Sequence, residues 1–471
     1  LHEGAGAAIE ALYDGQLDDH LSELAHHYQR STNTAKALEY LGRAGQQALQ
    51  RSSHTEAIGL FTSALELLRT SQERPERLEQ ELALQLGLGG ALTAAKGWAA
   101  AEVGEVFARA RKLCQQIGET PHLFKALSGL WGYYFVRGEM GPSLELAKQL
   151  LSIAQNAEDV AILPAAHHAM GQTLLLMGQS IPARTQLEFS CSLYDPAQYP
   201  SHAVPYFGCD IAVQSRHALS FTLWVLGFPD QAVDTIERAV ALARELGHPF
   251  SLCHALWSSQ IVHAWRGDAT AALKFTDAYL QIANEHGFQL FSTVAILHRG
   301  ATLVVSGQAE EGIAHLREGL DAIQATGAEV CRPFYLPYLA VGYAILGRVE
   351  ESFIPLTEAM AFVESTGIRD LEPDLYRFKG ELTLKRPGAV SNSKIKAEAE
   401  SCFRQAIGVA RLQNAKSYEL RATISLARLL AEQGRHDEAH AILAEIYNWF
   451  TEGFDTVDLK DAKALLEELA T

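Results

Sequence analysis

The chain repeats one pattern at a fixed interval, in the stretches ARELGHPF (243–250), NEHGFQLF (284–291), QATGAEVC (324–331) and ESTGIRDL (364–371). Each stretch holds one glycine, and the four glycines fall 40 residues apart. Repetition at such a fixed period is typical of solenoid proteins, in which each repeat is one supersecondary unit. We therefore take a unit of about 40 residues as the building block of this fold.

A second series of glycines runs between the first and keeps the same step, offset by 20 residues. Its members are Gly227, Gly267, Gly307 and Gly347, with Gly138 and Gly178 before them and Gly434 after a longer insertion. Glycine adopts the left-handed conformation that ends a helix without steric strain. Two interleaved series therefore predict two helices per unit.

Apolar residues between the glycines recur at intervals of three and four, as in Ala232, Ile236, Ala239, Val240 and Ala243. This spacing places them on one face of a helix, and no strand-like alternation competes with it. Each helix is then ~18 residues and ~27 Å long. One helix pair cannot bury its apolar faces alone, so neighbouring pairs must stack.

The type of repeat follows from small residues at the expected helix crossings. Four helices carry a small–large–small or similar trio: Ala37, Leu41 and Ala44; Ala57, Phe61 and Ala64; Ala232, Ile236 and Ala239; Ala439, Leu443 and Ile446. Their partner helices carry Leu24, Ala25 and Tyr28, or Leu339, Ala340 and Tyr343. This pattern favours an all-α tetratricopeptide-like superhelix of ~10 helix pairs. A HEAT-like solenoid is the structural competitor, because its period is also about 40 residues. In one unit, Gly312 and Gly319 replace both crossing alanines.

Composition narrows the classes of partner. The net charge is −17, with no dense run of lysine and arginine, so nucleic acid is not an expected partner. No stretch of about 18 uninterrupted apolar residues occurs, so no membrane partner is expected either. The six cysteines show no metal-binding spacing, and we expect buried thiols in a reducing cytoplasm.

Catalytic motifs are missing from the sequence. It contains no phosphate-binding GxxxxGK[ST] loop, no HExxH and no GxSxG. Adjacent histidines on a helix point about 100° apart, so the pairs His26-His27 and His167-His168 cannot chelate one metal together. We therefore expect no enzyme activity, no catalytic residue, no metal and no cofactor.

Two stretches interrupt the array and help to divide it. Residues 195–208, DPAQYPSHAVPYFG, hold three prolines and three aromatic residues, and they form either a functional lip or an ordinary surface insertion. RPGAVSNSK (386–394) is expected to form a polar loop inside a later helix pair. We expect N-terminal repeats over 21–194, C-terminal repeats over 209–450 and a capping helix within 451–471.

Several segments resemble one family over nearly the whole length. They are residues 21–68 (LSELAHHYQR…ALELL), TLWVLGFPDQAV (222–233), LGHPFSLCHALW (246–257), TGAEVCRPFYL (326–336), ELRATISLARL (419–429) and YNWFTEGFDTVDLKDAKALLEEL (447–469). These segments are similar to the C-terminal tetratricopeptide region of bacterial STAND/AAA-type predicted signalling ATPases. Such proteins are often fused to class III adenylate/guanylate cyclase or Ser/Thr kinase domains.

The resemblance implies that residues 1–20 form the junction after an upstream NTPase and winged-helix region. The chain would then be the sensor arm of a cytoplasmic signalling protein, with that NTPase or cyclase as its attached effector. The family offers no catalytic residue to carry over to this chain, because its Walker motifs belong upstream. It also leaves the ligand open among proteins, peptides and small inducers.

A binding surface can be placed by counting back from the glycines. In stacked tetratricopeptide units the first helices of the pairs line the concave face, with positions about 13, 10, 6, 3 and 2 before the glycine directed into it. The count selects aromatic, imidazole and amide side chains, a mixture that concentrates binding energy in interfaces. They are His168, Gln172, Gln214, His217, Phe221, Trp224, His254, Trp257 and Trp265.

The sequence therefore predicts a recognition module that binds a protein or peptide and regulates an attached effector. A small-molecule inducer sensor is the alternative, and it predicts a deep pocket closed by the 195–208 insertion. A scaffold for self-association into a homo-oligomer is the third hypothesis.

Overall fold

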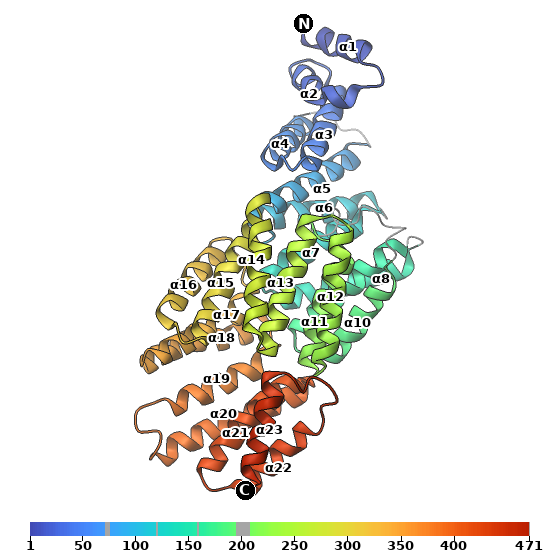
Figure 1. Cartoon of the computed structure of the whole chain (residues 1–471). Coiled ribbons are helices and arrows are strands. Elements are labelled where there is room, and N and C mark those ends of the chain that lie inside the picture. Colours follow the sequence, from blue (N-terminus) through green and yellow to red (C-terminus); the bar gives the residue numbers. More distant parts are fainter. Residues whose placement is uncertain (71–75, 119–120, 158–159, 195–207, 471) are drawn as a thin grey trace. The chain divides into compact units, whose positions relative to one another are not determined.

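The structure, a computed structural model, describes residues 1–70, 76–118, 121–157, 160–194 and 208–470. Within these ranges the chain forms 23 α-helices and two short 3₁₀ helices, and no strand. The helices divide into two compact units, residues 1–136 and 137–471, and within each unit every α-helix packs against the next (Figure 1). The prediction of an all-α repeat fold is therefore confirmed.

Unit 1 holds the first helices of the array. They are α1 (His2–Leu12), η1 (Leu17–His20), α2 (Leu21–Gln29), α3 (Thr34–Gln50), α4 (His54–Thr70), α5 (Arg77–Lys96), α6 (Ala101–Ile117) and α7 (His122–Val136).

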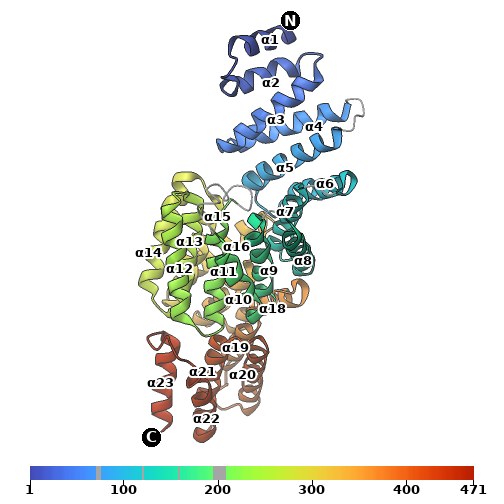
Figure 2. The ribbon, with the colours of Figure 1, turned by 90° about the vertical axis from the view of Figure 1, so that its right-hand side faces the viewer.

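Unit 2 holds the rest of the array. Its first helices are α8 (Met140–Asn156), η2 (Val160–Ile162), α9 (Leu163–Leu176), α10 (Ser180–Ser192), α11 (Ile211–Val225), α12 (Pro229–Glu245), α13 (Pro249–Arg266), α14 (Ala269–His286), α15 (Gln289–Val305) and α16 (Ala309–Ala325). The remainder are α17 (Arg332–Ile345), α18 (Val349–Thr366), α19 (Glu372–Leu384), α20 (Ser393–Gln413), α21 (Lys416–Glu432), α22 (His436–Tyr447) and α23 (Val457–Leu469). Figure 2 shows α9 to α15 standing side by side.

The two glycine series mark the helix ends, as predicted. Every glycine of both series has a positive φ, for example 90° at Gly227, 87° at Gly267 and 71° at Gly287. A residue with Cβ would be strained in that conformation. The helices between Gly227 and Gly367 have 14 to 18 residues, close to the expected length.

The crossing residues pack as the sequence predicts. Ala232, Ile236 and Ala239 on α12 have no exposed surface, and the same holds for Ala439 and Leu443 on α22. The trios on α3 and α4 are at most 2% exposed. Small side chains at these points let the helix axes approach, and the larger residue fills the seam between them.

The unit in which glycines replace alanines shows a very close approach of two helices. A Cβ placed on Gly312 of α16 would lie 2.8 Å from the carbonyl oxygen of Gly300 on α15. A Cβ on Gly300 would lie 2.9 Å from the backbone nitrogen of Leu316. The α15–α16 pair therefore crosses backbone to backbone, and alanine would not fit at either position without a shift.

In unit 1, a carboxylate fixes α1 on the following helices. Glu10 accepts hydrogen bonds from Tyr28 at 2.9 Å and from Tyr40 at 2.5 Å, and it forms an ion pair with Lys36. Burial raises the pKa of Glu10, but the hydrogen bonds from these three side chains outweigh it, so the net pKa is lowered. The carboxylate is therefore held in its charged form.

Unit 2 turns back on itself, so that its early helices meet its last ones. Ser417 of α21 donates a hydrogen bond of 2.5 Å to the carbonyl oxygen of Trp224, 193 positions earlier. Arg369 donates its backbone N–H to the Leu176 carbonyl oxygen at 2.7 Å, and Gln413 donates to the Arg369 carbonyl oxygen at 2.8 Å. The C-terminal ends of α9 and α11 are therefore covered by later parts of the unit.

Two predicted segments have different outcomes. The polar loop at 386–394 lies between α19 and α20, as expected, with its last two residues beginning α20. Residues 195–207 of the Pro-rich insertion lie outside the described residues. None of the described helices is long and apolar enough to cross a membrane.

Candidate ligand-binding site

All nine predicted site residues lie in unit 2, on three first helices of consecutive pairs. His168 and Gln172 lie on α9, Gln214, His217, Phe221 and Trp224 on α11, and His254, Trp257 and Trp265 on α13. The structure brings them together through α11, which contacts both α9 and α13. Eight of them fall into two groups, one polar and one rich in tryptophan, and the ninth, Gln172, lies near His168.

A chain of hydrogen bonds links α9, α10 and α11. Ser215 lies 3.2 Å from Nδ1 of His168, and its hydroxyl is 2.7 Å from that of Ser190. Ser190 is also 2.7 Å from the carbonyl oxygen of Pro164. The side chains of His168, Ser190 and Ser215 are buried, and Gln172 lies close enough to His168 to influence its pKa. His168 is therefore held firmly inside the unit.

The rings of α11 and α13 stack on one another. The His217 ring lies 5.0 Å from that of Trp257, nearly parallel, and 4.7 Å from that of His254, edge to face. His217 Nδ1 is hydrogen-bonded to the hydroxyl of Ser258. Phe291 of α15 lies beyond, 6.4 Å from the Trp257 ring centre. These contacts fix the orientation of three of the predicted residues.

Several polar atoms around these rings have no hydrogen-bond partner among the described residues. We name the polar group the histidine cluster, defined as His168, Gln214, His217, His254, Trp257, Gln260 and His298. Four side-chain atoms of this cluster are buried and unpaired: Oε1 of Gln214, Nε2 of His254, Oε1 of Gln260 and Nε2 of His298. Nε1 of Trp257 is also unpaired, since the neighbouring Tyr335 hydroxyl lies outside hydrogen-bond geometry. Unpaired buried groups of this kind destabilise a fold.

The four histidines of the cluster are neutral at pH 7. Burial lowers the pKa of His168 and of His298 to about 3, and that of His254 to about 4. Burial also lowers the pKa of His217, and the neighbouring His254 and His168 lower it further. A neutral imidazole has one donor and one acceptor nitrogen. The cluster therefore offers a ligand both donors and acceptors but no charge.

The second group, which we name the tryptophan cluster, consists of Phe221, Trp224, Trp265, Tyr418 and Arg421. Trp224 stacks on Trp265 at 4.5 Å and meets Tyr418 of α21 edge to face at 5.4 Å. The Arg421 guanidinium lies 4.6 Å from the Trp224 ring centre. Trp224 is only 2% exposed and Trp265 8%, so α21 covers the faces that the sequence placed in an open groove.

Counting back from the glycines missed two members of the histidine cluster. Gln260 lies seven positions before Gly267, and His298 lies nine before Gly307, so both fall one step from a counted position. His298 is hydrogen-bonded through Nδ1 to Tyr279 at 3.0 Å and is 2% exposed. The sequence does contain a signal for His298, because it is a polar residue on a helix, α15, whose neighbouring residues are largely apolar.

The fold defines the class to which the chain belongs: it is a tetratricopeptide-like α-solenoid. A Rap protein complexed with Competence and Sporulation Factor is similar, with 12% identity over 85% of this chain and 99% of that one, and a TM-score of 0.53. Cut9 in the APC/C hetero-tetramer Cut9-Hcn1 is similar with 15% identity over 99% of this chain and 82% of that one, and a TM-score of 0.51.

Comparisons by sequence add nothing to this likeness. No family model matches the chain, and no curated protein matches it. The structural likeness establishes the fold, including the choice of tetratricopeptide-like over HEAT-like packing.

Proposed function

We propose that this chain is a non-catalytic recognition module that binds a protein or peptide segment at the histidine cluster of unit 2. The observation that carries the proposal is the set of unpaired buried atoms on Gln214, His254, Trp257, Gln260 and His298. A polypeptide backbone carries alternating N–H donors and C=O acceptors and no charge, which matches this set. The Rap protein that shares the fold was solved with Competence and Sporulation Factor, which supports a ligand-binding role for such a solenoid.

The ligand would stack on the aromatic rings as well as pair with the polar atoms. Phe221, His254 and Trp257 are partly exposed, whereas Trp224 and Trp265 are buried. We therefore expect direct contact from the first three, with Gln172 and His168 at one side. The other members of the tryptophan cluster would support the site from behind.

A pair of apolar substitutions separates a binding role from a structural one. Gln214→Leu and Gln260→Leu remove an unpaired buried carbonyl, so each should raise the melting temperature. If the amides recognise ligand, the same substitutions should weaken binding tenfold or more. A gain in stability together with a loss of binding is the pattern expected of a functional site.

Binding can be measured with peptides selected on the chain itself. Random dodecapeptides displayed on phage are selected on the wild-type chain, and the enriched peptides are synthesised and titrated by calorimetry. Trp257→Phe, which removes the indole N–H, should weaken them, whereas Trp449→Phe, outside the cluster, should not. Peptides that bind all variants equally would refute the proposed site.

We further propose that binding regulates an attached signalling NTPase or cyclase, on the family resemblance alone. The coding sequence before Leu1 should then contain a nucleotide-binding Walker motif. The chain itself should bind neither ATP nor GTP, which calorimetry on the isolated protein tests. A coding sequence without such a motif would remove the effector from this proposal.

A further inference from the structure

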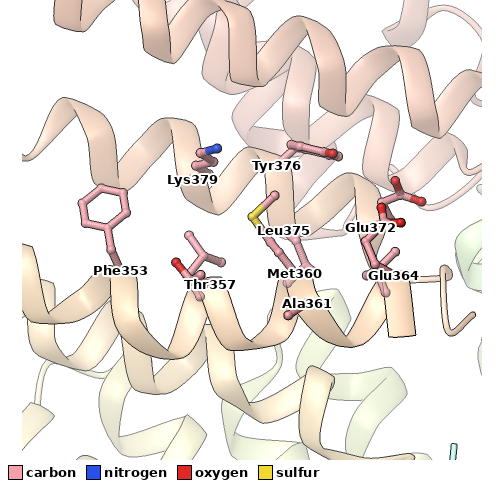
Figure 3. A pocket seen from close by; sticks show the side chains of 11 residues that line it. Phe353, Thr357, Met360, Ala361, Glu364, Glu372, Leu375, Tyr376 and Lys379 are labelled. Carbon is pink, nitrogen blue, oxygen red and sulfur yellow. The ribbon is translucent and has the colours of Figure 1, made fainter. Parts of the chain in front are cut away.

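A hollow in unit 2 shares no residue with the histidine cluster. It lies between α18 and α19 and has a volume of about 360 Å³ (Figure 3). This size falls within the range of ligand-binding pockets, which is about 300–1,000 Å³. The two helices contact each other less extensively than most neighbouring helices of the unit do.

The floor and walls of the hollow are apolar. Leu356 and Val363 of α18 and Leu375 of α19 are buried at its base, and Met360 lies between them, half-buried. Two aromatic residues flank it, Phe353 on α18 and Tyr376 on α19 (Figure 3). An apolar hollow of this kind accepts one or two large aliphatic side chains.

Carboxylates gather at one end of the hollow. Glu364 ends the α18 side and Glu372 begins the α19 side, and they are close enough for the charge of Glu364 to raise the pKa of Glu372, after burial as the larger cause. Arg369 pairs with Glu372 at 3.6 Å, so the three groups leave one net negative charge. Glu364 is exposed and has no ion pair among the described residues. This end therefore favours a cation.

The opposite charge lies two helical turns away. Lys379 lines the same hollow, seven residues after Glu372 on α19, and forms no ion pair with any described residue. Seven residues of helix correspond to a rise of ~10 Å. Four residues of extended peptide place their first and last Cα atoms ~10 Å apart as well. The spacing of the charges therefore matches an extended tetrapeptide.

From this match we propose that the α18–α19 hollow binds an extended peptide segment with a basic residue at one end, an acidic residue at the other and large aliphatic residues between. The basic residue pairs with Glu364 and Glu372, the acidic residue pairs with Lys379, and one aliphatic side chain enters between Met360 and Leu375. This site is distinct from the histidine cluster and does not depend on its function.

Met360 offers a direct reporter of occupancy. The chain has four methionines, at 140, 170, 177 and 360, so a spectrum of ¹³C-methyl methionine contains four signals. Met360→Leu assigns one of them to the hollow. The probe is an acetylated, amidated tetrapeptide of sequence Arg-Leu-Leu-Glu, titrated into the full chain to millimolar concentration. It should shift the Met360 signal in a saturable way, while those of Met170, on α9, and Met177, which follows α9, stay in place.

Charge variants of peptide and protein test the recognition. Gln-Leu-Leu-Gln and Glu-Leu-Leu-Glu should bind more weakly than the mixed peptide. Glu364→Gln and Lys379→Gln should each weaken the mixed peptide about two- to five-fold, as expected for partly exposed ion pairs. Glu350→Gln, on the same helix but outside the hollow, and Lys394→Gln are the matched controls. Lys379→Glu should reverse the preference and favour Arg-Leu-Leu-Arg.

Three other results would each contradict the proposal. An unchanged Met360 signal with every peptide means that the hollow binds no such segment. Equal shifts from the mixed and the neutral peptide mean that the charges take no part. A shift produced equally by leucine amide means that the hollow is an apolar pocket for small molecules.

Discussion

Arg266 at the end of α13 forms an ion pair with Asp455, 189 positions later, through bonds of 2.6 and 2.7 Å from Nη2 to the two carboxylate oxygens. The same guanidinium donates through Nη1 to Asp230 at 2.8 Å. Glu452 accepts hydrogen bonds from the backbone N–H groups of Asp230 and Gln231 nearby. One cation thus ties the early helices of unit 2 to the segment before α23.

We expect Arg266→Ala to loosen this connection. The arginine side chain is 16% exposed but its partners are 52% and 68% exposed, so the pairs are largely screened by water. The free energy of unfolding should fall by about 1 kcal/mol. Amide hydrogen exchange should accelerate in residues 451–457, next to the lost contact.

The control for this variant is Arg238→Ala, which removes a surface pair with Asp234 on α12. Both side chains of that pair are more than half exposed, so we expect a change within about 0.5 kcal/mol. Equal effects of the two substitutions would show that Arg266 does not hold the last helices in place.

The pH dependence of stability should reflect the buried histidines. Their pKa values, about 3 for His168 and His298 and about 4 for His254, lie below 6.5, so the unfolded chain binds more protons at acid pH. The contribution of these neutral, buried histidines to the free energy of unfolding is fully present above pH 6.5 and is lost as the pH falls towards 4. Each histidine contributes at most about 1.4 kcal/mol per pH unit. Burial raises the pKa of Asp370 to about 7, so this group changes the stability in the opposite direction: its contribution is lost as the pH rises towards 7.

His298→Gln isolates the contribution of one histidine. Urea denaturation between pH 5 and 7.5 should show a shallower loss of stability than in the wild type, by up to one proton. His436→Gln, at an exposed position on α22, is the control for the loss of a histidine that is not buried. A His298→Gln slope identical to the wild type would mean that His298 is not buried in solution.

The sequence predicts the local parts of this fold well because their causes are local. A glycine with positive φ ends a helix wherever it stands, and the spacing of small residues fixes which face crosses the neighbour. The return of α21 onto α11 depends instead on small rotations accumulated over five helix pairs. No sequence pattern around Trp224 predicts that Ser417 and Tyr418 cover it. Trp257, on the next first helix of the stack, remains partly exposed. Counting from the glycines selects most members of the histidine cluster that we propose as the site, but which of their polar atoms are unpaired depends on the packing.

Trp224→Ala should therefore behave as a core truncation. The ring contacts Trp265, Tyr418 and Arg421, so its removal opens a cavity between them. We expect a loss of about 3–5 kcal/mol in the free energy of unfolding. Trp257→Ala, at a partly exposed position, should cost less. A larger loss for Trp257 than for Trp224 would contradict the packing around α21.

The α15–α16 crossing gives the most direct test of helix packing. Gly312→Ala places a methyl group 2.8 Å from the Gly300 carbonyl oxygen and 2.9 Å from the Val304 backbone nitrogen, and backbone atoms cannot move aside cheaply. We expect a loss of about 1–3 kcal/mol, the usual cost of overpacking. Gly408→Ala is the matched control, because Gly408 is also helical but a Cβ there meets nothing within 4 Å. That substitution should stabilise the chain by about 0.5–1 kcal/mol through the higher helix propensity of alanine. Thermal denaturation of both variants measures this difference in stability. If the Gly312→Ala protein were as stable as the Gly408→Ala protein, α15 and α16 would lie farther apart than the structure places them.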